Sequence, residues 1–195
     1  MDLSGIMRGA GDFYKKALPV LLVSIIGSIL AGTLLAGGHM RSVIKQVPGL
    51  LLILPAFLAT RGNVYGSLGA RISTGLHQGF IEPELEYNKR LLNAMMAALL
   101  NGLIISVFVA ASSTVIMDFF NKSIIAFWKL VSILLVASFI SGVTLIIILV
   151  SLLFVAFKRG MDPDTLIGPI MTTAGDIFGV AYLYISVILV GWVVL

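Results

Sequence analysis

The stretch TLIGPIMTTAGDIFGVAYLYISVILVGWVVL, residues 165–195, is largely apolar and carries a single charged side chain, Asp176. A helix needs about 20 apolar residues to cross a bilayer, so this stretch predicts a transmembrane helix. A charge at that depth costs roughly 2.5–3.5 kcal/mol on insertion scales. We therefore expect the Asp176 carboxylate to face a polar partner, a water-filled path or a cation.

The rest of the chain follows the same apolar pattern. Of its 195 residues 59% are hydrophobic and 11% are charged, whereas soluble domains carry about 25% charged residues. Residues 17–38, 91–117 and 130–157 predict three uncharged spans, and residues 47–79 predict another whose second half is polar and rich in glycine. The sequence thus predicts one domain over residues 1–195, an all-α integral membrane protein with five transmembrane helices.

The segment before the first span has a different pattern. Residues 1–16 alternate apolar and charged side chains at helical spacing, which predicts a short helix on the membrane surface. Basic residues flank the spans unevenly, seven against four: Arg8, Lys15, Lys16, Lys89, Arg90, Lys158 and Arg159 on one side, and Arg41, Lys45, Lys122 and Lys129 on the other. The positive-inside rule then predicts a cell-membrane protein with its N-terminus inside and its C-terminus outside.

Prolines and glycines interrupt the second span. Pro48 and Pro55 favour a kink, and a break around Pro55–Asn63 would turn free carbonyls inward; a simple kink without function is the alternative. Glycines spaced four apart allow helices to approach closely. This chain has three such steps: Gly62–Gly66, Gly75–Gly79 and Gly175–Gly179.

Oxygen-bearing residues surround Asp176 on its helix. Thr172, Asp176 and Gly179 share one face, and oxygen ligands suit Mg²⁺ and Ca²⁺. The chain has no cysteine and two well-separated histidines, so we expect neither a zinc nor a copper site. The competing interpretation is a structural ion pair between Asp176 and Arg61, which would make the protein a membrane scaffold that transports nothing.

Other functions find no support in the sequence. It contains no nucleotide-binding motif, no Ser/His/Asp grouping and no basic cluster with interleaved aromatic residues. We therefore expect no enzyme activity, no prosthetic group and no nucleic acid partner. Asp162 and Asp164, before the fifth span, fit an N-cap and a first-turn acid, and they could also attract cations at the mouth of a path.

Two motif blocks resemble a known family. The stretch PAFLATRGNVYGSLGAR, residues 55–71, continued by LHQG, residues 76–79, resembles the second membrane helix of the MgtE magnesium channels and of the solute-carrier-41 transporters. The stretch GMDPDT, residues 160–165, followed by Gly168-Pro169 and by residues 172–179, resembles their fifth helix.

This resemblance implies a dimer of five-helix units with the ion pore between them and Mg²⁺ as the transported ion. By resemblance Asp176 is the acidic ligand, Gly62-Asn63 is the matching step of the second helix, and carbonyls near Gly168 and Thr172 assist. Arg61, Gly62 and Thr173 would line or gate the path.

The resemblance has two exceptions. MgtE channels carry large cytoplasmic sensing domains and solute-carrier-41 proteins carry two membrane units, whereas this chain has one unit only. We therefore expect it to pair with itself as a homodimer, or with a homologous half, surrounded by membrane lipid. Exchange of Mg²⁺ for Na⁺ or H⁺ is the alternative to channel-like passage.

Overall fold

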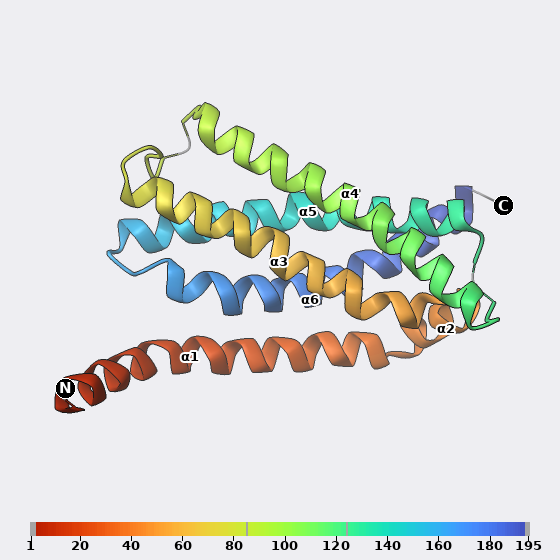
Figure 1. Cartoon of the computed structure of the whole chain (residues 1–195), viewed down its shortest axis with the longest axis horizontal. Helices are drawn as coiled ribbons and strands as arrows, with labels where there is room; N and C mark the ends of the chain where they lie inside the picture. Colours follow the sequence, from red (N-terminus) through yellow and green to blue (C-terminus); the bar gives the residue numbers. More distant parts are fainter. Residues whose placement is uncertain (1–2, 85, 124, 194–195) are drawn as a thin grey trace.

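The computed structural model describes residues 3–84, 86–123 and 125–193, and every regular element in that part of the chain is an α-helix (Figure 1). The elements are α1 (Leu3–Ala36), α2 (Gly38–Gln46), α3 (Leu50–His77), α4 (Lys89–Phe119), α5 (Phe127–Lys158) and α6 (Asp164–Val193). Residues 1–2 and 194–195, at the ends of the first and last predicted segments, lie outside the described residues.

The helices confirm an all-α membrane protein. Ala17–Ala36 of α1, all of α4 and α5, and Asp164–Gly191 of α6 are long and apolar enough to cross a bilayer. The bent pair α2–α3 supplies a fifth crossing when it is counted as one span. The described ends of α1 and α6 point to opposite ends of the bundle, as five crossings require (Figure 1).

The second span is bent, as the sequence predicted, but at Pro48 and not at Pro55. α2 and α3 meet at 114°, and the bend falls at residues 47–49, where Gly49 has a φ of 89°. α3 then continues through Pro55 to His77, so the predicted break around Pro55–Asn63 is wrong. Pro55 lies inside α3, where it removes the hydrogen bond to the carbonyl of Leu51. Membrane helices tolerate such a proline because neighbouring groups and local adjustments satisfy the freed carbonyl.

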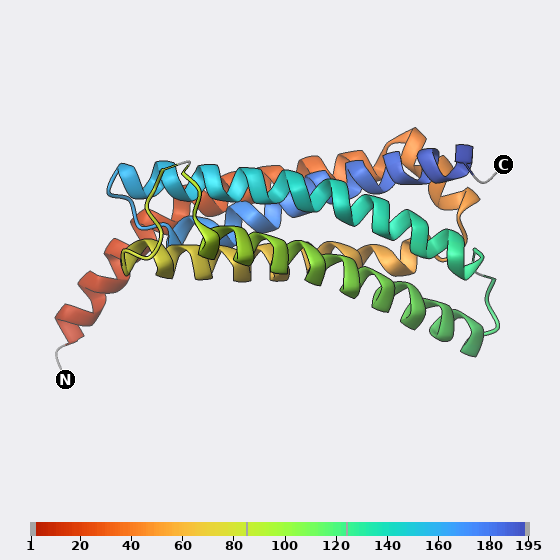
Figure 2. The same ribbon diagram turned by 90° about the horizontal axis from the view of Figure 1, so that it is seen from above.

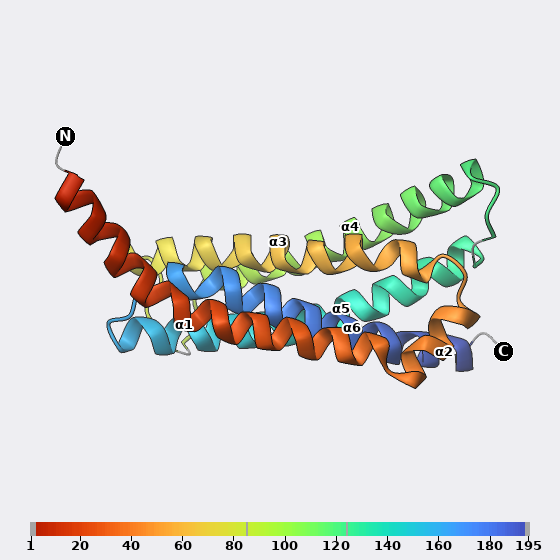
Figure 3. The ribbon, with the colours of Figure 1, turned by 90° about the horizontal axis from the view of Figure 1, so that it is seen from below.

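The N-terminal segment is helical, as predicted, but continuous with the first span, and its place on the membrane surface stays a prediction. α1 runs without interruption from Leu3 through Pro19 to Ala36. Its first part nevertheless leans away from the bundle (Figures 2 and 3), and Pro19 lies where such a bend is expected.

α6 lies at the centre of the bundle. It contacts α1 on one side and α3 and α5 on the others, and α4 closes the bundle by packing on α3 and α5. Two apolar clusters fill the interior, one around Leu68 and Leu149 and one around Phe57 and Leu134. Arg61 lies on α3 between them, so a polar layer separates the two halves of the core.

Candidate functional site

The site is built where α3 crosses α6, and glycines bring the two backbones together there. A Cβ atom on Gly175 would lie 3.0 Å from the Cβ atom of Arg61 and 3.6 Å from the backbone nitrogen of Gly62. A Cβ atom on Gly179 would lie 2.7 Å from Cδ2 of Leu58. The Gly175–Gly179 step is therefore a helix-packing step, as its spacing predicted.

The other two glycine steps do not bring helices together in this way. Gly62 packs beside Thr172, since its Cβ would lie 3.5 Å from the Thr172 Oγ1 atom, whereas Gly66 faces open space. Gly75 packs on Ile81 of the loop that follows α3, and Gly79 has a φ of 70° just beyond the end of that helix.

A second face of α6 packs on α1 through hydroxyl groups. The side-chain oxygens of Ser24 and Thr173 lie 2.6 Å apart, and the Thr173 hydroxyl donates to the Pro169 carbonyl at 2.9 Å. Gly27 on α1 leaves room for the Thr173 methyl group. Thr173, which we expected to line the path, thus lies in the α1–α6 contact.

The face of α6 between these two contacts carries Gly168, Thr172 and Asp176, spaced four apart and therefore aligned. Gly168 and Thr172 are exposed and Asp176 is half-buried. The Thr172 hydroxyl donates to the Gly168 carbonyl at 2.9 Å, which leaves its own lone pairs available. Asp176 lies about 18 Å along α6 from Asp164 at helical rise, near the middle of the span. We call Gly168, Thr172 and Asp176 the oxygen row.

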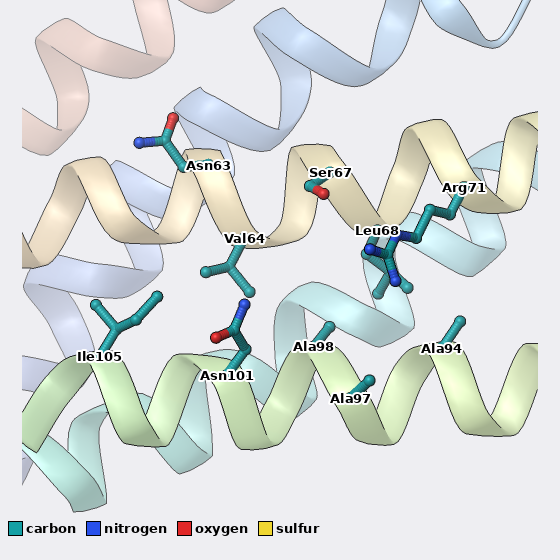
Figure 4. A pocket seen from close by; sticks show the side chains of 10 residues that line it. All are labelled: Asn63, Val64, Ser67, Leu68, Arg71, Ala94, Ala97, Ala98, Asn101 and Ile105. Carbon is teal, nitrogen blue, oxygen red and sulfur yellow. The ribbon is translucent and has the colours of Figure 1, made fainter.

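Asn63 lies beside the oxygen row. It follows Gly62, which packs on Thr172, and its side chain is exposed on the side of α3 away from α4 (Figure 4). Among the described residues no three His, Asp or Glu side chains converge on one point. One copy of the chain therefore offers a single carboxylate with amide, hydroxyl and carbonyl oxygens, a set that suits a hard divalent cation.

The accessible face of α3 differs in composition from the apolar faces of the bundle that suit contact with lipid. It carries Ala56, Ala59, Asn63, Ser67, Ala70 and Thr74, all exposed and all small or polar. The accessible face of α4 carries large apolar side chains instead, such as Ile104, Phe108 and Val115. Small residues let helices pack closely and polar ones avoid hydrocarbon, so the α3 face suits another helix or water. We call it the small-residue face.

Arg61 points away from the oxygen row, into the polar layer between the two core clusters. It is 1% exposed. Its guanidinium donates to the hydroxyls of Ser138 at 2.7 Å, Ser106 at 3.2 Å and Ser141 at 3.4 Å, and it lies 4.1 Å from the centre of the Phe57 ring. Ser106 and Ser138 also hydrogen-bond to each other.

These contacts overturn the proposed ion pair. Within residues 3–84, 86–123 and 125–193, Arg61 makes its hydrogen bonds to serines of α4 and α5 and to its own helix, and forms no ion pair with Asp176. The sequence analysis missed the serines, although polar side chains inside long apolar runs were the available signal. Arg61 is also too deeply buried to line a path in this conformation.

The layer continues at Tyr65, one turn further along α3. Its buried hydroxyl has no hydrogen-bond partner among the described residues. It lies between two glycines: a Cβ atom on Gly102 would be 3.2 Å away, and one on Gly142 would clash with it. The glycines of α4 and α5 thus make space for the tyrosine ring of α3.

The acidic pair at the start of α6 has a structural use. One carboxylate oxygen of Asp162 accepts a hydrogen bond from the Asp164 backbone nitrogen at 3.0 Å, and the Asp162 carbonyl accepts one from the Thr165 hydroxyl at 2.9 Å. This is the capping arrangement that the sequence predicted. Both carboxylates lie at the end of the bundle, and Asp164 is about 18 Å along α6 from Asp176. Their role at a path mouth stays a prediction.

Comparisons with known proteins agree with these features. The family model for MgtE, described as a divalent cation transporter, matches residues 54–186. Solute carrier family 41 member 2 of Gallus gallus is 27% identical over 173 residues, which cover 85% of this chain and 29% of that protein. Solute carrier family 41 member 3 of Mus musculus is 25% identical over 174 residues, 87% of this chain and 35% of that protein. The chain spans about a third of the length of these relatives. No solved structure matches it.

Proposed function

Because the chain belongs to the MgtE family of divalent cation transporters, we propose that it carries Mg²⁺ across the membrane, with Asp176 as the key ligand of the ion. The observation that carries this proposal is the oxygen row at the middle of a span. The Asp176 carboxylate makes no ion pair or hydrogen bond within the described residues, so a cation is the partner that would compensate its charge at that depth.

The path lies between two copies of the chain. One Asp176 supplies one negative charge, and two of them would neutralise one divalent cation where the dielectric constant is low. A two-fold axis would bring the same residue from both copies together. The small-residue face supports this arrangement, because it offers a second copy close approach beside Asn63 and Thr172. A homologous five-helix unit could replace the second copy.

The first contacts of the ion follow from this arrangement. Mg²⁺ gives up its waters reluctantly and usually keeps several. The Asp176 carboxylates would therefore hold a largely hydrated ion, while Asn63, Thr172 and the Gly168 carbonyl accept hydrogen bonds from its waters. Arg61 would not contact the ion. Its hydrogen bonds would fix α3 to α4 and α5 and so hold Asn63 in place.

The basic residues support an orientation within the cell membrane. The side with the larger number of basic residues would lie inside, which places the N-terminus inside and the C-terminus outside. The capped start of α6, with Asp162 and Asp164, then lies at the inner mouth of the path.

Mg²⁺ uptake into proteoliposomes tests the proposal, with wild type compared with Asp176→Asn. We expect uptake by the wild type and a loss of at least tenfold in the variant, because an amide cannot supply the ligand charge. Equal uptake by both proteins would refute the site. Uptake that requires an opposing Na⁺ or H⁺ gradient would identify an exchanger, and uptake without one would identify a channel.

A further inference from the structure

A groove between α3 and α4 ends in a hollow that borders two arginines. The central part of the groove is a cavity of about 260 Å³, lined by Leu68 and Arg71 on α3 and by Asn101 on α4, among others (Figure 4). Arg71 extends from α3 toward α4, and it also lines the next hollow, of about 240 Å³, together with Arg90 from the first turn of α4. We call this second space the arginine hollow; its other main lining residues are Thr74, Gln78, Phe80 and Ile81.

No acidic side chain compensates the arginine hollow in the part of the chain that the structure describes. Its lining contains no Asp or Glu. In the acidic loop that follows α3, Glu82, Glu84 and Glu86 all lie outside this lining. Glu84 lines a hollow beside α5, and Glu86 lines one beside Tyr87. Two permanent positive charges therefore border a space that can hold an anion.

The arginine hollow is partly organised before any ligand binds. The Arg90 guanidinium lies 4.3 Å from the centre of the Phe80 ring, which restricts its position. The Asn88 side chain donates to the Phe80 carbonyl at 3.1 Å and accepts from the Arg90 and Leu91 backbone nitrogens, so it fixes the loop to the start of α4. Guanidinium groups match the geometry of phosphate oxygens and bind them in a bidentate manner.

The surroundings favour a lipid as the source of the phosphate. The hollow lies at the end of two spans, where headgroups would be found, and basic pockets between membrane helices bind anionic headgroups. The groove that continues from it between α3 and α4 is lined in part by the apolar residues Leu68, Ala97 and Ala98, against which an acyl chain would lie. We propose that the arginine hollow binds the phosphate of an anionic phospholipid, with Arg71 and Arg90 as its ligands.

Native mass spectrometry of the detergent-purified protein with added phosphatidylglycerol tests this proposal. The test variant is Arg71→Gln/Arg90→Gln. The control is Lys89→Gln/Arg159→Gln, which removes the same charge from exposed residues at the same end of the bundle, outside the hollow. We expect the wild type and the control to bind one lipid with affinities within about twofold, and the test variant roughly 25-fold more weakly, since each basic residue contributes about fivefold.

Three outcomes would overturn the proposal. Unchanged binding by the test variant would exclude the two arginines, and equal losses in the test and control variants would show only general charge attraction. Displacement of the lipid by inorganic phosphate at a similar concentration would identify a soluble phosphate as the ligand. If the double variant aggregates, the single variants Arg71→Gln and Arg90→Gln should each bind about fivefold more weakly, and unchanged binding by both would overturn the proposal.

Discussion

Replacing Ser138 with alanine tests whether the serine cluster holds Arg61. Ser138 supplies the shortest of the serine hydrogen bonds to the guanidinium, at 2.7 Å, inside a bundle where Arg61 is 1% exposed. A hydrogen bond to a charged group contributes about 1.5–3 kcal/mol. Ser106 keeps its bond to the same nitrogen, so we expect a loss of about 2 kcal/mol of unfolding free energy. For a chain of 150–250 residues this lowers the midpoint of thermal unfolding by roughly 4–8 °C.

The matched control for Ser138→Ala is Ser132→Ala on the same helix. Ser132 is exposed and its hydroxyl donates only to the Trp128 carbonyl, one turn earlier. Both changes gain the same helix propensity, so the difference between them reports the buried contacts of Ser138 with Arg61 and Ser106. The assay is thermal unfolding of the purified protein in detergent, followed by its tryptophan fluorescence.

The same argument extends to a double-mutant cycle. In the Arg61→Met background, Ser138→Ala should cost less than in the wild type, because only its bond to Ser106 is then lost. If Ser138→Ala shifts unfolding no more than Ser132→Ala in the wild type, or by the same amount in both backgrounds, the serine cluster does not hold the arginine and the reasoning fails.

Three further predictions concern packing and capping. Gly142→Ala should lower the unfolding midpoint by several degrees, from an overpacking cost of about 1–3 kcal/mol, because its methyl group meets the Tyr65 hydroxyl; a smaller shift in the Tyr65→Phe background would confirm the contact. Gly175→Val should separate α3 from α6 and reduce Mg²⁺ uptake more strongly than Gly191→Val, whose Cβ meets open space. Asp162→Ala should lower the unfolding free energy by about 1 kcal/mol through the lost cap, measured by thermal unfolding. Asp162→Asn should leave it unchanged, because asparagine also caps.

The spans could be predicted from the sequence because each depends on its own composition. Residues 91–117 and 130–157 are uncharged runs long enough to cross a bilayer, and α4 and α5 contain them. The sequence named two prolines but not which one breaks the span, because membrane helices tolerate proline; the chain bends at Pro48–Gly49, and α3 continues through Pro55.

The site could be predicted only in part, because a sequence shows which residues share a face but not which helix that face meets. Spacing aligned Thr172 with Asp176, and the structure leaves both on an accessible face. Thr173, the neighbour of Thr172, turns about 100° around the helix and packs on α1. The partners of Arg61 are three serines of α4 and α5 that stand singly in apolar runs. Only tertiary packing brings them together, so the sequence alone could not identify them.

The number of Mg²⁺ ions that Asp176 binds per chain tests the central proposal most directly. Equilibrium dialysis of the purified protein would compare the wild type with Asp176→Asn and with the control Asp118→Asn, an exposed carboxylate near the end of α4. We predict that the wild type and Asp118→Asn each bind one more Mg²⁺ per two chains than Asp176→Asn does. Equal binding by all three proteins, or a difference of one Mg²⁺ per single chain, would contradict a shared site between two Asp176 carboxylates.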